Sequence, residues 1–149
     1  SMRKLQIREL TSEDISSVAL IELMSFTTPW SEKSLFSEVY KTNSISRVAL
    51  LDGTIAGYIF VQHVLDEGHL LDLAIHPDYQ RLGVATALLV DVITELRLRK
   101  CRFFYLEVRA SNHAAIRLYS RSGFRKINAR KDYYNLPTEN AVVMTMELQ

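Results

Sequence analysis

Residues 70–86 read Leu-Leu-Asp-Leu-Ala-Ile-His-Pro-Asp-Tyr-Gln-Arg-Leu-Gly-Val-Ala-Thr, and this stretch decides the fold. Its first part, Leu70 to Ile75, is almost continuously apolar, as expected for a central strand covered on both faces, and His76-Pro77 ends it. A long helix that packs on the sheet is predicted next, because apolar residues then recur at helical spacing, at Val84, Ala85, Leu88, Leu89, Val92, Ile93 and Leu96.

The loop between this strand and this helix, Gln80 to Thr86, has the features of an anion site. Small residues let successive backbone N–H groups face one ligand, and the helix N-terminus adds a partial positive charge beside Arg81. The loop lacks the Gly-Lys-Ser/Thr of a Walker motif and the three glycines of a dinucleotide fingerprint, so ATP and NAD are disfavoured. A plain strand-to-helix turn at Gly83 explains the loop alone equally well.

On either side of this stretch, strand and helix signals alternate. The clearest turn is Asp52-Gly53, a hairpin signal between two runs rich in β-branched and aromatic residues. Strands are predicted over 4–10, 46–51, 54–64, 102–108, 124–129 and 142–148, and helices over 11–26, from Ser31, and over 114–122 with Gly123 as a left-handed cap. Together these elements give the order βααβββαβαββ. We therefore predict an α/β (α+β) fold in one domain, 1–149, with a mixed central sheet of about seven strands and helices on both faces.

Bulk properties exclude several classes of protein. The 149 residues carry a formal charge of +1, which offers no basic field for nucleic-acid binding. No stretch approaches the ~20 apolar residues of a membrane helix, and the single Cys101 excludes an internal disulfide. We expect a cytoplasmic monomer that binds neither nucleic acid nor membrane, and we interpret Ser1 before Met2 as a tag remnant. No metal is predicted, because the four histidines lack metal-ligand spacing.

Four blocks of sequence resemble one enzyme family. The Gln80-Arg81-x-x-Gly83-x-Ala85 pattern looks like the acetyl-CoA motif of the GNAT superfamily. Within it the chain is similar to the RimI-like ribosomal-protein alanine N-acetyltransferases, and this resemblance spans nearly the whole chain. It is carried by Pro29-Trp30-Ser31-Glu32-Lys33, Asp78-Tyr79-Gln80-Arg81, Leu106-Glu107-Val108-Arg109-Ala110-Ser111-Asn112 and Leu118-Tyr119-x-x-x-Gly123-Phe124.

The resemblance implies acetyl-CoA as co-substrate, held between two splayed strands. The backbone of Leu73, Ala74 and Ile75 would run beside the pantetheine arm, and Asn112 would contact the cofactor. The pyrophosphate would be held by Arg81, Leu82, Gly83, Val84, Ala85 and Thr86. Ala85 departs from the second glycine of many relatives, but alanine has little bulk and a better helix propensity by roughly 1 kcal/mol.

The same resemblance assigns two catalytic roles. Acetyl transfer to an amine needs a base for the amine and an acid for the departing thiolate. RimI-like enzymes use a Glu and a Tyr at the positions of Glu107 and Tyr119 in these roles. From the residues alone, Glu107 could equally be a salt-bridge partner of Arg109 or of a neighbouring strand, and Tyr119 a core aromatic.

The acceptor is implied to be the free N-terminal α-amine of a protein, most closely the N-terminal alanine of a small-subunit ribosomal protein, attacked directly in a ternary complex. Trp30 and the Tyr133-Tyr134 pair are expected in loops that flank this N-terminus, although each could serve only in packing. Asp66, Glu67 and Asp72 are expected near the acceptor side, where they could favour a basic peptide, although exposed loop acids are usually only solvated. The alternatives are acetylation of a small amine or an internal lysine, and a non-catalytic acetyl-CoA-binding module.

Overall fold

The computed structural model describes residues 3–149, and Ser1, the expected tag remnant, lies outside the described residues. The elements follow the predicted order, with two additional short 3-10 turns at Ser12–Asp14 and Pro77–Tyr79. They are β1 (Leu5–Glu9), α1 (Ile15–Ser25), α2 (Glu32–Val39), β2 (Ser44–Leu51), β3 (Thr54–Val64), β4 (Glu67–Ile75), α3 (Val84–Leu98), β5 (Phe103–Arg109), α4 (His113–Arg121), β6 (Arg125–Tyr134) and β7 (Glu139–Glu147).

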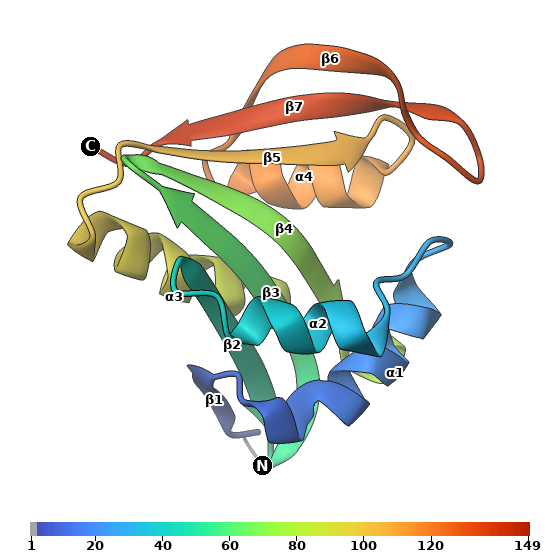
Figure 1. Cartoon of the computed structure of the whole chain (residues 1–149), viewed down its shortest axis with the longest axis vertical. Helices are drawn as coiled ribbons and strands as arrows, with labels where there is room; N and C mark the ends of the chain where they lie inside the picture. Colours follow the sequence, from blue (N-terminus) through green and yellow to red (C-terminus); the bar gives the residue numbers. More distant parts are fainter. Residues whose placement is uncertain (1–2) are drawn as a thin grey trace.

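The strands form one mixed sheet of order β1-β2-β3-β4-β5-β7-β6, as Figure 1 shows. Among the strands of the described residues, β4 and β5 are the only parallel pair, and the other neighbours are antiparallel. The β4–β5 pairing is short, running from Glu67 opposite Phe103 to His69 opposite Tyr105. Beyond His69 the two strands diverge toward their carboxyl ends, so the sheet opens between them (Figure 1).

Helices cover both faces of the sheet, as predicted, and each face has its own core. One core joins the sheet to α3 and α4 and includes the buried Leu88, Phe104 and Tyr119. The other lies under α1 and α2 and includes Leu35 and Phe60. Leu70 to Ile75 is covered on both faces, as predicted, because Leu70, Leu73 and Ile75 pack in the α3 and α4 core, whereas Leu71 and Ala74 pack in the α1 and α2 core.

Local sequence explains where the elements begin and turn. At the predicted β2–β3 hairpin, Asp52 and Gly53 both have positive φ, 52° and 84°, as a type I′ turn requires. Ser31 caps α2 by accepting a hydrogen bond from the amide of Ser34 at 3.1 Å, again as predicted. Tyr133 and Tyr134 were expected in a loop, and this prediction was wrong. They end β6, which continues past an irregular register around Asp132, whose positive φ of 50° interrupts the alternating pattern.

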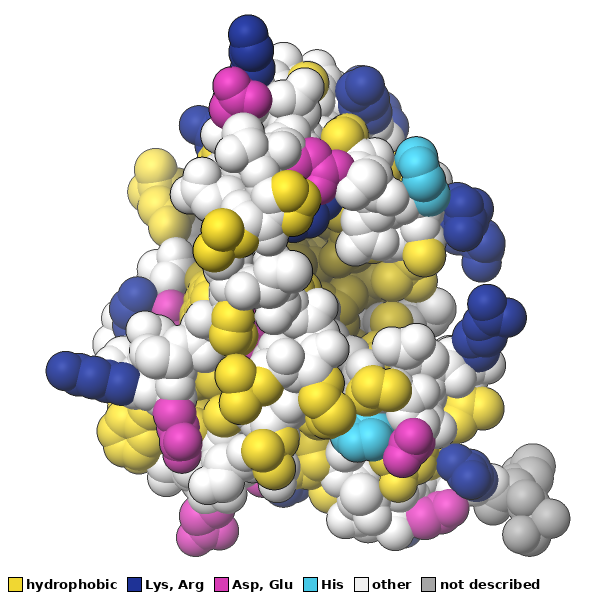
Figure 2. Space-filling model, turned by 90° about the vertical axis from the view of Figure 1, so that its right-hand side faces the viewer, with side chains coloured by type: hydrophobic (Ala, Val, Ile, Leu, Met, Phe, Trp, Pro, Cys, Tyr) yellow, Lys and Arg dark blue, Asp and Glu magenta, His cyan; other side chains and the backbone are white. Residues whose placement is uncertain are grey.

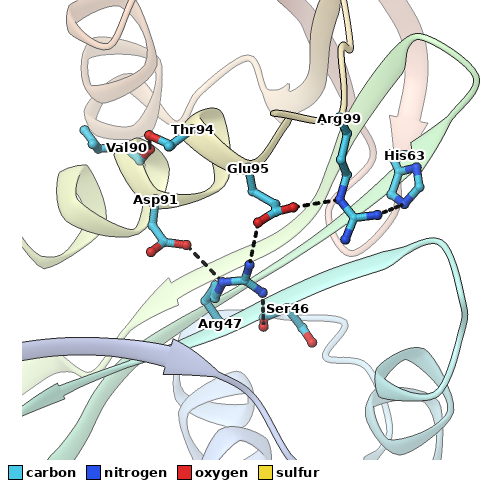
Figure 3. Close-up of polar contacts among 8 residues, drawn as sticks. All are labelled: Ser46, Arg47, His63, Val90, Asp91, Thr94, Glu95 and Arg99. Atoms are coloured by element: carbon cyan, nitrogen blue, oxygen red, sulfur yellow. Dashed lines mark hydrogen bonds and ion pairs between the residues drawn. The ribbon is translucent and has the colours of Figure 1, made fainter. Parts of the chain in front are cut away.

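An ion-pair network fixes α3 to the sheet (Figure 3). Arg47 of β2 contacts Asp91 at 2.9 Å and Glu95 at 3.6 Å, and Glu95 also pairs with Arg99 at 2.9 Å. Arg99 in turn contacts His63 of β3 at 2.9 Å. Burial and the charge of Arg99 lower the pKa of His63, so its neutral ring can accept this contact. The network holds α3, and therefore the loop before it, in a fixed position over β2 and β3.

Among residues 3–149, no helix is both long and apolar enough to cross a membrane.

Candidate active site

A cleft of about 420 Å³ opens where β4 and β5 diverge. Its walls come from β4, β5, α1, α4 and the segment that joins α1 to α2, so it reaches both faces of the sheet. Figure 2 shows the side of the molecule on which the surface is hollowed, with hydrophobic side chains on the floor. The lining residues are Glu22, Ser25, Phe26, Thr27, Thr28, Trp30, Leu70, Leu71, Asp72, Leu73, Glu107, Val108, Arg109, Asn112, Ala115, Tyr119 and Tyr134.

The β4 wall offers backbone groups rather than charged side chains over Leu73, Ala74 and Ile75. One edge of this segment pairs with β3, where Leu73 lies opposite Ile59. The other edge has no strand partner, because pairing with β5 stops at His69. Peptide groups on such an edge are free to bond a ligand that runs along it. Of these three residues, Leu73 lines the cleft, whereas Ala74 is buried in the α1 and α2 core.

The Arg81 to Thr86 loop lies at the N-terminus of α3 and is not part of the cleft lining. Arg81 and Gly83 both have positive φ, 63° and 80°, so the chain curls before the helix begins. The first helical hydrogen bond in this turn runs from the amide of Ala87 to the carbonyl of Gly83 at 3.1 Å. The preceding amides therefore have no partner within the helix. A Cβ added at Gly83 would meet nothing within 4 Å, so the surface above this turn is open.

Side chains in this loop divide into two kinds. Arg81, Leu82 and Thr86 are exposed, whereas Val84 is buried in the sheet core. Val84 can therefore contribute only its backbone amide to an anion. Exposed amides at a helix N-terminus, together with a guanidinium, suit a phosphate group.

Asn112 lies at the edge of the cleft and caps α4. Its Oδ1 accepts a hydrogen bond from the amide of Ala115 at 3.2 Å, so this oxygen is already in use. The side-chain NH₂ group is the part of Asn112 suited to a ligand in the cleft.

Glu107 lines the β5 wall and is half-buried. Its Oε1 pairs with the guanidinium of Arg130 on β6 at 3.5 Å, and not with Arg109, which binds Glu139 at 3.2 Å. Phe103 and Tyr105 share its face of β5, and all three residues are half-buried. The geometry therefore leaves a carboxylate that is held by one cation and can reach the cleft.

Tyr119, which belongs to α4, also lines the cleft, and only 7% of its surface is exposed. Its ring packs edge-on against Phe124, with centroids 5.7 Å apart. Burial, followed by the charge of Asp72 and the neighbouring Tyr134, raises the pKa of Tyr119 above the usual value. Tyr119 is thus both a core aromatic and a protonated hydroxyl at the cleft.

Of the residues predicted to contact substrate, Trp30 and Tyr134 line the cleft and Tyr133 does not. Trp30 also packs on Phe60 of the core, with centroids 6.0 Å apart. Tyr134 lies under the guanidinium of Arg109 at 4.7 Å, and burial raises its pKa to about 12. Tyr133 stacks edge-on beside Tyr134 at 5.0 Å and is largely exposed.

Two carboxyl groups outside the predicted catalytic, cofactor and substrate residues also line the cleft. Asp72 is buried on β4 rather than exposed in a loop, and Glu22 is buried on α1. Glu22 accepts hydrogen bonds from the hydroxyl of Tyr58 and, at 3.0 Å, from the amide of Trp30. A carboxylate inside the apolar run from Leu70 to Ile75 is the signal that could have identified Asp72, and Glu22 shares the helical face of Val18.

Comparison with known proteins identifies the class to which this fold and cleft belong. Residues 12–124 match the model of the Acetyltransferase (GNAT) family, so the chain belongs to that family and is an acyltransferase. It is 38% identical over 149 residues to the [Ribosomal protein bS18]-alanine N-acetyltransferase of Escherichia coli (strain K12), which covers 95% of this chain and 97% of the relative.

Solved structures agree with this assignment. The crystal structure of the ribosomal-protein-S18-alanine N-acetyltransferase from Escherichia coli has a TM-score of 0.92 and 36% identity, over 98% of this chain and 95% of the other. Ard1 from Thermoplasma volcanium has a TM-score of 0.87 and 28% identity, over 97% and 98% of the two chains. The predicted GNAT fold and the predicted resemblance are therefore confirmed.

Proposed function

We propose that this enzyme transfers the acetyl group of acetyl-CoA to the free N-terminal α-amine of a protein, with the N-terminal alanine of ribosomal protein bS18 as its substrate. The observation that carries the proposal is that Glu107 and Tyr119 line one cleft at the divergence of β4 and β5. The similarity to an Escherichia coli enzyme named for this reaction supports the choice of acceptor. We further expect a cytoplasmic monomer that needs neither nucleic acid nor membrane.

The residues present fit acetyl-CoA. The curled turn at Gly83 leaves amides open to a pyrophosphate, with Arg81 as a cation, and the free edge of β4 at Leu73 to Ile75 suits the amides of a pantetheine arm. The NH₂ group of Asn112 would add a contact at the cleft edge. When bound, acetyl-CoA supplies an acyl group activated as a thioester.

Glu107 is proposed as the base for the acceptor. An N-terminal amine has a pKa of roughly 7.7 to 8.0, so near neutral pH it must lose a loosely held proton before it attacks. The Glu107 carboxylate would take that proton, directly or through one water, while Arg130 holds it at the β5 wall. Glu107 thus prepares the nucleophile without forming a covalent bond to the acyl group.

Tyr119 is proposed as the acid. A departing thiolate needs a proton, and the raised pKa of Tyr119 keeps its hydroxyl protonated at neutral pH. Because the cleft is lined by α1 on one face of the sheet and α4 on the other, acceptor and co-substrate can bind together. Direct transfer in a ternary complex then forms the amide bond as the C–S bond breaks.

Recognition of the acceptor is proposed to involve Trp30 and Tyr134, which flank the cleft, with Tyr133 holding Tyr134 from outside. An aromatic ring beside a hydroxyl can pack on a small first side chain and hydrogen-bond the peptide backbone that follows it.

The test uses two peptides of one sequence, one with a free N-terminal alanine and one blocked at its N-terminus but carrying a lysine, each incubated with acetyl-CoA. We expect thiol release, and a mass gain of about 42 Da from one acetyl group, only with the free N-terminus. Acetylation of the blocked peptide would instead identify a lysine acetyltransferase. Turnover of neither peptide would point to small amines or to a binding module and would overturn the proposed acceptor.

A further inference from the structure

Glu22 and Asp72 form a buried pair of acids in the wall of the cleft. They come from α1 and β4, and their exposed fractions are 1% and 4%. Their side chains lie within hydrogen-bonding reach of each other, and burial, followed by this contact and the charge of Glu22, raises the pKa of Asp72 to about 10. Two carboxyls this close share one proton at neutral pH. The pair therefore carries one negative charge.

Within residues 3–149, no ion pair compensates this charge. The ion pairs among residues 3–149 join other groups, and none includes Glu22 or Asp72. The other carboxylate that lines the cleft, Glu107, is paired with Arg130. A buried charge without a partner is unfavourable unless something in the site offsets it. In this cleft, the Glu22–Asp72 pair is the negative charge still available to a ligand.

Hydrogen bonding leads to the same conclusion. Glu22 already accepts from the hydroxyl of Tyr58 and from the amide of Trp30. Asp72 Oδ2 is buried and has no hydrogen-bond partner within the described chain. A buried acceptor of this kind calls for a donor. An ammonium group offers three donors together with the opposite charge.

The acid pair also lies across the cleft from Glu107, the proposed base. Counting from the last paired residues, His69 and Tyr105, Asp72 lies three positions along β4 and Glu107 two positions along β5. A register shift adds one residue to β4 before Asp72, so Asp72 and Glu107 lie at similar positions along the two strands, and both line the cleft. A group between the β4 and β5 walls can contact the acid pair on one side and Glu107 on the other.

We propose that the Glu22–Asp72 pair is the subsite that binds the acceptor's N-terminal ammonium group, with Glu107 on the opposite wall positioned to remove its proton. This inference rests on the proposed function, because it takes the acceptor to be an α-amine. At neutral pH most N-terminal amines are protonated, so an anionic wall recruits the major form of the acceptor. Trp30, whose amide is held by Glu22, is thereby tied to the same subsite.

The experiment measures peptide affinity by calorimetry on protein saturated with CoA, which has no acetyl group to transfer. One peptide begins with a free alanine, and its twin begins with a propionyl group, which has the same size but no amine. We expect wild type to bind the free amine roughly tenfold or more tightly than the twin, as for a hydrogen bond to a charged group. Glu22→Gln/Asp72→Asn, which removes the charge and conserves shape, should bring this ratio to about one.

Two matched variants separate the subsite from its neighbours. Asp72→Asn leaves the Glu22 carboxylate and its charge, and Glu107→Gln removes the other carboxylate of the cleft, so both should keep the ratio within about threefold of wild type. A ratio near one in wild type, an unchanged ratio in the double variant, or loss of the ratio in Glu107→Gln would each overturn the inference. If the double variant does not fold, wild type and Glu107→Gln still decide it. Turnover of the free-amine peptide with acetyl-CoA tests the proposed function separately.

Discussion

Replacing Tyr119 with phenylalanine removes one hydroxyl from the cleft and leaves the ring in place. The ring accounts for the contact with Phe124 at 5.7 Å and for most of the buried surface of this side chain. Stability should therefore change by less than about 1 kcal/mol, because no cavity larger than one oxygen atom is left. Any larger effect of Tyr119→Phe on activity then reports on the hydroxyl itself.

The size of the catalytic effect follows from the role of the proton. A positioned general acid contributes roughly 10²–10⁴ in rate, or about 3–5 kcal/mol of transition-state stabilisation. Because the Tyr119 hydroxyl lies in a buried site with a raised pKa, water does not replace it easily as a donor. We expect kcat to fall by roughly 100-fold or more, with little change in KM for acetyl-CoA.

The assay follows thiol release from acetyl-CoA and from an acetyl thioester whose thiol is more acidic. A weakly basic leaving group needs less help from an acid, so the defect of Tyr119→Phe should be much smaller with the activated thioester. Melting curves of both proteins provide the control for folding. An equal defect with both thioesters, or a kcat within about threefold of wild type, would refute the role of Tyr119 as the acid.

Three further predictions concern other parts of the molecule. Glu107→Gln should lower kcat/KM roughly 100-fold at pH 7, with a deficit that shrinks toward pH 9 as the amine loses its own proton; rate–pH profiles check this, and a constant deficit would contradict it. Gly83→Ala should raise the KM for acetyl-CoA and lower the free energy of unfolding by about 1 kcal/mol, because alanine disfavours positive φ. The control Gly53→Ala, at a similar φ of 84°, should lower the free energy of unfolding by a similar amount and leave the KM unchanged. Hydrogen bonds from Arg8 hold the pKa of Asp14 below its usual range, so the stability they contribute is present above about pH 4 and is lost as the pH falls. Asp14→Asn should therefore be about 1–2 kcal/mol less stable than wild type in urea unfolding at pH 7. A difference of the same size at about pH 2 would argue against this explanation.

The fold was predictable because most elements carry local signals. The hairpin at Asp52-Gly53, the cap at Ser31 and the helical spacing from Val84 onward all depend on nearby residues, and the structure confirms them. The prediction failed where the signal was not local. The far part of β6, which ends with Tyr133 and Tyr134, lies beyond the irregular register at Asp132.

The site was predictable only in part. The resemblance indicated Glu107, Tyr119 and the loop at Gly83, and the structure brings the first two to one cleft. Asp72 and Glu22 lie 50 residues apart and meet only when α1 packs on β4, so no spacing in the sequence joins them. A long-range contact of this kind depends on the register of the whole sheet.

The short pairing of β4 with β5 has a consequence for how this protein can change over time. Every amino acid has the same peptide group, so a ligand that bonds to a strand edge does not depend on which side chains that strand carries. Substitutions around the mouth of the cleft can then alter the choice of acceptor while the hold on a common acyl donor persists. The unpaired edge between β4 and β5 thus allows one fold to acquire new acceptor specificities while it keeps the same reaction.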